Sequence, residues 1–164
     1  MKRFILASAL LCLMQIPGTA AEDGLRGAPQ SVGQSIEGTW IAQLTDANGV
    51  RTLFEVGSFS PDGSYTGANT DGTHSAHKGV WARTGHRQFT MTILFFTHDP
   101  MTSVFNRIVK ARLYITLAED GNSYDSVAER IVMDTAGNIL AVIPGIRGHS
   151  IRMPVELPQY LPPQ

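Results

Sequence analysis

Two stretches in the middle of the chain, residues 87–98 and 105–117, alternate between apolar and polar positions. In the second stretch, an apolar side chain occupies every other position from Val109 to Leu117. A period of two is typical of a β-strand that buries one face and exposes the other. In the first stretch one face is apolar throughout, and the other becomes apolar towards its end. The two stretches predict two of the clearest strands of the molecule.

Six further stretches resemble them and are separated by turn sequences rich in Asp, Asn and Gly, such as residues 46–49 and 134–137. The six predicted strands are residues 36–44, 50–59, 64–69, 78–83, 123–134 and 138–153. No segment shows the i, i+3, i+4, i+7 apolar spacing of a helix. Regular strands with tight turns predict an all-β fold, an antiparallel up-and-down barrel of about eight strands over residues 36–153. A two-sheet β-sandwich is the alternative.

A barrel of about eight strands is just wide enough to be filled by side chains or to hold one small ligand. The inward faces of the two long strands supply the apolar residues that we expect to line such an interior. They are Phe89, Met91, Ile93, Phe95, Val109, Ala111 and Leu113. Tyr124 and Glu129 are the polar residues that we add to this candidate ligand-binding set.

The inward face of residues 123–134 has two interpretations. One face carries Val127, Glu129, Ile131 and Met133, and the other carries Tyr124, Ser126, Ala128, Arg130 and Val132. If the first face is inside, burial would raise the pKa of Glu129 and suit it to anchoring a ligand or to acid–base chemistry. If the second is inside, Glu129 is solvated. In residues 50–59 the choice is also open, because Phe54 and Val56 compete with Leu53 and Phe59.

The first 21 residues have the form of a secretory signal peptide. Lys2 and Arg3 are followed by an apolar run and then by the small residues 18–21. The only cysteine, Cys12, lies inside that run, so the mature chain would have neither disulfides nor thiol chemistry. We expect residues 22–35 to be a flexible lead, residues 154–164 a proline-rich tail, and the location to be periplasmic or secreted.

Charge excludes some partners. Loss of the signal peptide would leave 11 basic and 14 acidic side chains, a formal charge of −3. Nucleic-acid binding needs clustered Lys and Arg, which this sequence lacks. No second apolar run is long enough to predict a membrane span.

Gly38-Thr39-Trp40 resembles the Gly-x-Trp signature that opens the first strand of lipocalins and other calycin barrels. The resemblance implies that the indole of Trp40 plugs one end of the barrel and that an arginine of the last strand covers it. By position this is Arg152, with Arg147 as a second choice. It also implies that Gly38, Trp40 and Arg152 are structural, and that the interior binds a small hydrophobic molecule.

Candidate chemistry is sparse. His74 and His77 beside Asp71 are a candidate metal pair, but residues three apart on a strand point to opposite faces, so we expect no metal and no cofactor. No nucleophile elbow, zinc-protease motif or phosphate loop is present in the sequence. The sequence favours a protein that binds a small hydrophobic ligand. The alternatives are an isomerase or cyclase like the allene-oxide-cyclase-type barrels, or a packed barrel that acts through its surface.

Overall fold

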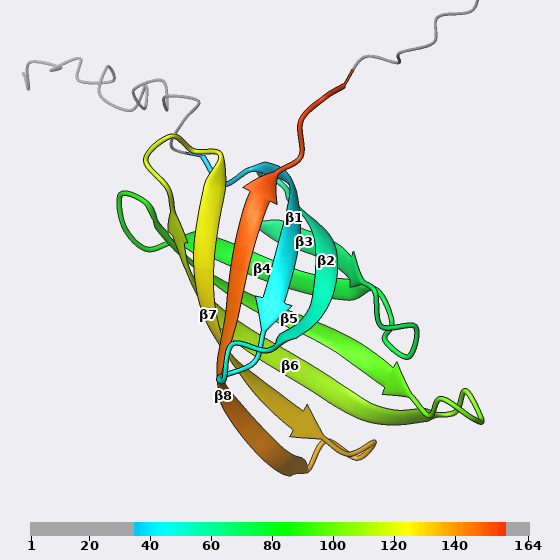
Figure 1. The fold of residues 1–164 in the computed structure, drawn as a ribbon. Coiled ribbons are helices and arrows are strands. Elements are labelled where there is room, and N and C mark those ends of the chain that lie inside the picture. The colour runs from blue at the N-terminus through cyan, green and yellow to red at the C-terminus, as the bar shows by residue number, and fades with distance from the viewer. Residues whose placement is uncertain (1–34, 157–164) are drawn as a thin grey trace, which may run out of the picture.

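A computed structural model describes residues 35–156 as an all-β structure without helices (Figure 1). Its strands are β1 (Gly38–Thr45), β2 (Arg51–Phe59), β3 (Ser64–Asn69), β4 (His77–Arg83), β5 (Gln88–His98), β6 (Phe105–Leu117), β7 (Ser123–Met133) and β8 (Ile139–Arg152). The predicted signal peptide, nearly all of the predicted lead and residues 157–164 of the predicted tail lie outside the described residues. No helix in the described part of the chain is long and apolar enough to cross a membrane.

Each strand pairs antiparallel with the next one in the chain, and β1 pairs with β8 to close the barrel. The predicted up-and-down barrel is therefore confirmed, and the sandwich alternative is wrong. The inward faces of β5 and β6 are also as predicted, with Phe89 to Phe95 and Val109 to Leu117 alternating into the interior. In β8, residues before Arg147 pair only with β7, because β1 ends at Thr45.

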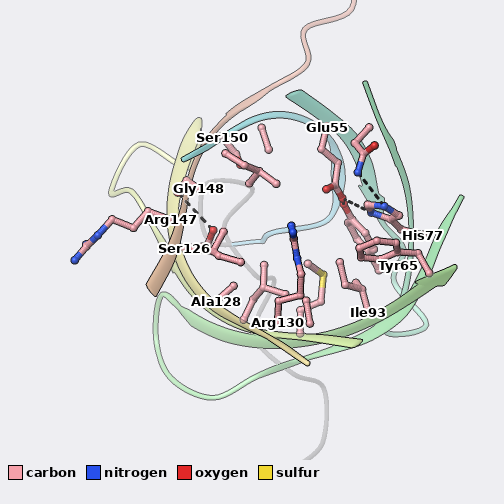
Figure 2. Close-up of a pocket in the computed structure, with 18 of the residues that line it drawn as sticks. Glu55, Tyr65, His77, Ile93, Ser126, Ala128, Arg130, Arg147, Gly148 and Ser150 are labelled. Carbon is pink, nitrogen blue, oxygen red and sulfur yellow. Dashed lines mark hydrogen bonds and ion pairs between the residues drawn. The ribbon is translucent and has the colours of Figure 1, made fainter. Parts of the chain in front are cut away.

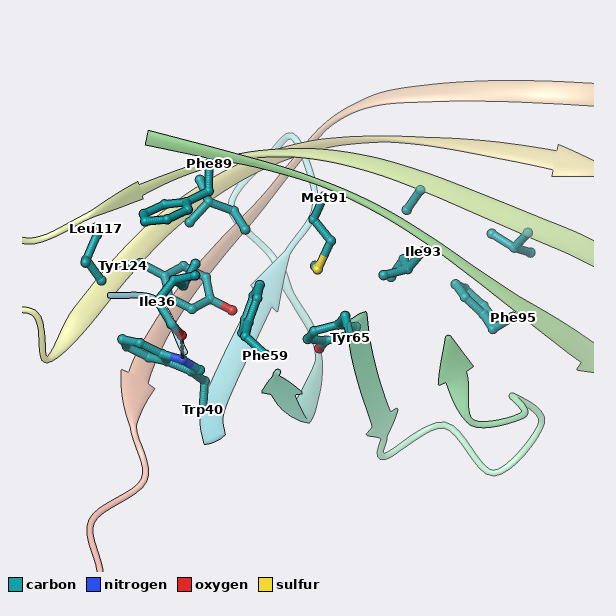
Figure 3. Packing of buried hydrophobic residues seen from close by; sticks show 13 residues of the cluster. Ile36, Trp40, Phe59, Tyr65, Phe89, Met91, Ile93, Phe95, Leu117 and Tyr124 are labelled. Carbon is teal, nitrogen blue, oxygen red and sulfur yellow. Dashed lines mark hydrogen bonds between the residues drawn. The ribbon is translucent and has the colours of Figure 1, made fainter. Parts of the chain in front are cut away.

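One end of the barrel is filled by Trp40, and we call it the Trp40 half (Figure 3). Its buried side chains pack ring against ring: the centroids of Trp40 and Tyr124 lie 4.8 Å apart, and those of Phe59 and Tyr124 lie 6.0 Å apart. Ile36, Phe89 and Leu117 complete this core, each at most 1% exposed. This half contributes most to the stability of the fold, because it buries large apolar side chains away from water.

Arg152 covers Trp40 from outside, in the position that the resemblance to calycins implied. Its guanidinium carbon lies 4.3 Å from the centroid of the indole, and its nitrogens donate to the carbonyls of Ser35, Glu37 and Gly121. Gly38 makes this possible, since it has a φ of 115° and a Cβ there would lie 2.9 Å from Nη1 of Arg152. The indole nitrogen of Trp40 donates to the carbonyl of Ile36 at 2.8 Å.

Candidate functional site

The other half of the barrel contains a cavity, and we call it the cavity half. Residues from all eight strands line the cavity, whose volume is about 40 Å³ when measured as room for the centre of a water-sized sphere. One water molecule needs about 10–15 Å³ by that measure, so the cavity holds roughly three. One wall is apolar and includes Ile93, Phe95, Ala111 and Leu113. Polar groups reach the cavity from more than one side, Glu55 and His77 from one and Arg130 from another, as Figure 2 shows.

The structure brings most of the predicted lining residues together. Six of the nine candidates border the cavity: Met91, Ile93, Phe95, Ala111, Leu113 and Tyr124. Phe89 and Val109 face inward but are packed in the core and do not border the cavity. Burial raises the pKa of Tyr124 to about 12, so its hydroxyl stays protonated.

The expected place of Glu129 inside the barrel is wrong. Glu129 lies on the outer face of β7, where it forms an ion pair with Arg112, its neighbour across the strand pair on β6. The face of Tyr124, Ser126, Ala128 and Arg130 is the inner one. Counting apolar residues misled the choice, because the outer face of this barrel also carries exposed apolar side chains such as Val127.

A buried carboxylate is present in the cavity, but it is that of Glu55 on β2. Glu55 is 7% exposed, and its Oε1 accepts hydrogen bonds from the hydroxyl of Tyr65 at 2.6 Å and from Nδ1 of His77 at 3.1 Å. Burial and the nearby charge of Glu55 raise the pKa of Tyr65, so its hydroxyl remains a donor. The two hydrogen bonds that this oxygen accepts offset part of the free-energy cost of burying the carboxylate.

Two glycines make room for the Tyr65 hydroxyl. Gly57 on β2 and Gly67 on β3 are paired across the two strands beside the Tyr65 ring. A Cβ at Gly57 would lie 1.8 Å from the hydroxyl oxygen of Tyr65, and one at Gly67 would lie 2.8 Å from it. The local sequence is therefore built around the contact between Tyr65 and Glu55.

Asn69 joins the two histidines of the predicted metal pair. Its amide nitrogen lies 2.9 Å from Nδ1 of His74 and 3.2 Å from Nε2 of His77. The amide oxygen accepts from the backbone of Asp71, so the nitrogen is the atom that faces both rings, and both facing ring nitrogens must accept. The contacts assign each histidine as neutral, with His77 donating to Glu55 and His74 donating to Asp71.

Both imidazoles lie against Phe95. The ring centroids of His77 and Phe95 are 4.3 Å apart in a stacked arrangement, and those of His74 and Phe95 are 4.7 Å apart. Burial lowers the pKa of His74, an effect that the carboxylate of Asp71 opposes. No group of three or more His, Cys, Asp or Glu side chains between residues 35 and 156 is arranged to hold a metal ion.

Arg130 is the cation of the cavity. Its side chain extends from β7 towards the centre of the barrel, across from Glu55 (Figure 2). Nε of Arg130 is buried and has no hydrogen-bond partner within the described residues. Burial lowers the pKa of Arg130, while the charges of Glu55 and Asp71 oppose this, and an arginine stays protonated regardless. A half-buried guanidinium without a hydrogen-bond partner among the described residues is a group to which a ligand can add hydrogen bonds.

Glu55 and Arg130 are the candidate site residues that sequence reasoning missed, and His77 was considered only as a metal ligand. In residues 50–59 the apolar side chains Phe54 and Val56 point outward, and the face with Glu55 points inward. Gly57, between Glu55 and Phe59 on one face, was the available signal, since a glycine inside a strand marks a close approach. No comparable signal identifies Arg130.

Comparison with known proteins assigns neither a family nor a function to this chain. No protein-family model matches the chain, and no curated protein matches it. The conclusions about function therefore rest on the closed antiparallel barrel and on the geometry of its cavity half.

Proposed function

We propose that this protein binds one small, largely apolar molecule inside the cavity half of its barrel. The observation that carries the proposal is a cavity lined by apolar side chains into which a few polar groups converge, among them the guanidinium of Arg130, which has no hydrogen-bond partner among the described residues. Small-molecule sites have this composition, in which apolar walls supply affinity and a few polar groups fix the orientation. A barrel that served only as a packed scaffold would gain nothing from a buried carboxylate and a half-buried guanidinium in its interior.

Movement of one side chain would enlarge the cavity. About 40 Å³ accommodates a ligand head group but not a whole molecule. Because Arg130 makes no hydrogen bond or ion pair with a described residue, its side chain can change rotamer without breaking either kind of interaction. Movement of this one side chain opens the centre of the barrel to an apolar tail that lies against Ile93, Phe95 and Leu113.

We also propose that the protein works outside the cytoplasm as a lipocalin-like barrel. The signal-peptide pattern of residues 1–21 supports the location, and the arrangement of Gly38, Trp40 and Arg152 supports the kinship with calycins. N-terminal sequencing of protein recovered from the producing cells tests the location. A chain that begins near Glu22 is the expected result, and a chain that retains residues 1–21 contradicts it.

Binding is tested by titrating the purified protein with an environment-sensitive apolar fluorophore. We expect saturable binding at one site per chain. Ala111→Phe, which fills the cavity, should weaken binding about tenfold or more, because the added ring occupies ligand space. Ala82→Phe adds the same ring on the exposed side of β4 and should leave affinity unchanged. A folded wild-type protein that shows no saturable binding would exclude the proposal.

Glu55 favours a second candidate function, an isomerase that moves a proton next to a carbonyl group. Oε2 of Glu55 has no hydrogen-bond partner among the described residues, and Arg130 lies across the cavity from it. The free oxygen would take a proton from the carbon beside a carbonyl, and the guanidinium would stabilise the enolate oxygen that forms. Return of the proton to another carbon completes the isomerisation.

The test of this second function is hydrogen exchange in D₂O. Deuterium should enter octan-2-one at the carbons beside its carbonyl in the presence of the protein, as followed by NMR. Glu55→Gln should abolish the exchange, and Glu129→Gln on the outer face should not. Exchange at the uncatalysed rate with wild-type protein would leave the barrel as a binding protein without this activity.

A further inference from the structure

Two opposite charges face each other across the cavity without touching. Glu55 on β2 and Arg130 on β7 both border it, yet no ion pair joins them. Arg147 also borders the cavity, but its side chain is exposed and points away (Figure 2). The carboxylate and the guanidinium are therefore the two charges that a bound head group would meet.

The charges of the cavity sum to zero. His74 and His77 are held neutral by Asn69, and burial keeps the Tyr65 and Tyr124 hydroxyls protonated. An ionic ligand would add an uncompensated charge in a poorly solvated place, which is costly. A ligand with a neutral head group avoids this cost.

The free hydrogen-bonding groups specify what that head group must contain. The guanidinium of Arg130 can only donate, and Oε2 of Glu55 can only accept. A ligand that satisfies both carries an acceptor for Arg130 and a donor for Glu55 on neighbouring atoms. A primary carboxamide is the simplest example, since its carbonyl faces the guanidinium and its NH₂ group faces the carboxylate.

We propose that the cavity selects neutral head groups that pair a hydrogen-bond acceptor with a donor, and that it discriminates against carboxylates and amines with the same apolar tail. This selectivity rests on the proposed binding function. It assigns Glu55 and Arg130 as the specificity-determining pair, with Tyr65 and His77 as positioning residues that hold Glu55 in place.

The experiment is displacement of the bound fluorophore by octanamide, octanoate and octylamine. In the wild-type protein, octanamide should bind about tenfold tighter than either ion, because only it satisfies both groups without adding charge. In Glu55→Gln the cavity keeps a positive charge, and octanoate should become the tightest of the three. In Arg130→Met it keeps a negative charge, and octylamine should become the tightest.

Matched controls are Glu129→Gln and Arg112→Met, which remove the same charges from the ion pair on the outer face and should leave the order unchanged. Octanoate as the best wild-type competitor would overturn the inference in favour of an anion site at Arg130. Equal displacement by all three compounds, unaltered by Glu55→Gln, would overturn it and leave the binding function standing. Failure of the fluorophore to bind folded wild-type protein would exclude both.

Discussion

The two halves of this barrel are built on opposite principles. In the Trp40 half, the polar atom of the Trp40 side chain is satisfied by a backbone carbonyl and the rings of Trp40, Phe59 and Tyr124 pack edge to face. In the cavity half, Glu55 and His77 are buried beside a cavity, and Arg130 extends towards its centre. The Trp40 half is closely packed, whereas the cavity half contains charged side chains and a cavity.

The difference is what the proposed binding function requires, with one half stabilising the fold and the other holding the ligand. Burial of apolar surface stabilises the fold, whereas buried charges contribute little to stability or reduce it. A chain retains such charges where they serve a ligand, and the packed half compensates for their cost. Substitutions in the two halves should therefore have different consequences, and four predictions test this, in order of expected size.

The largest effect is expected at the centre of the Trp40 half. Trp40→Ala leaves a cavity beneath Arg152 and removes contacts with Tyr124, so it should lower the free energy of unfolding by about 3–5 kcal/mol. Urea denaturation followed by circular dichroism measures this. Trp40→Phe keeps most of the ring and should lose much less. A loss below about 1 kcal/mol in Trp40→Ala would contradict the role of this half.

The second-largest effect is expected at Gly57, where the two halves meet. Gly57→Ala places a methyl group against the Tyr65 hydroxyl, and we expect it to cost about 1–3 kcal/mol of stability through overpacking. Gly72→Ala is the matched control, because nothing lies within 4 Å of a Cβ there. If the clash with Tyr65 is the cause, Gly57→Ala should add no further loss in a Tyr65→Leu background. A full additional loss would place the strain elsewhere.

The strands were predictable from the sequence because alternation and turn chemistry are local. The strand at residues 105–117 was predicted with its observed bounds, and Asp134 and Gly137 form the turn that their spacing indicated. If each strand pairs with the next strand in the chain, few sheet topologies are possible, so the barrel could be predicted as well.

The site was less predictable, because the sequence does not show which face of a strand closes inward. Phe54 and Val56 are apolar yet exposed, and Glu55 between them is charged yet buried. The curvature and closure of the whole barrel decide the inward face, and these are not local properties. For the same reason both faces of β7 stayed open, and Glu129 rather than Arg130 was included among the candidate ligand-binding residues.

A smaller effect is expected in the cavity half. Glu55→Gln should change the free energy of unfolding by no more than about 1 kcal/mol in either direction, since Gln keeps an oxygen for Tyr65 and His77, and the half-buried Arg130 forms no ion pair with Glu55 that would be broken. Urea denaturation next to Trp40→Ala gives the comparison directly. A loss as large as that of Trp40→Ala would show that the carboxylate is structural, and it would remove the contrast between the halves.

The smallest effect is a pH dependence that arises at His74. Burial lowers the pKa of His74 below its ordinary 6.5, so as the pH falls below about 6.5 the unfolded chain takes up a proton that the folded chain resists. The stabilisation is complete above that pH and is lost as the pH falls through the lowered pKa of the folded state. Unfolding measured at pH 7.5 and pH 5.5 should show a smaller decline in His74→Gln than in the wild type.

The control for this titration is His86→Gln, on an exposed turn away from the cavity, which should decline as the wild type does. Protonation of His74 would also turn its Nδ1 into a donor that faces the Asn69 amide nitrogen, so the network that holds His77 and Glu55 loosens as the proton enters. Fluorophore affinity should then weaken over the same pH range in the wild type and less in His74→Gln. An unchanged affinity between pH 7.5 and pH 5.5 would separate the histidines from the binding site and confine their role to folding.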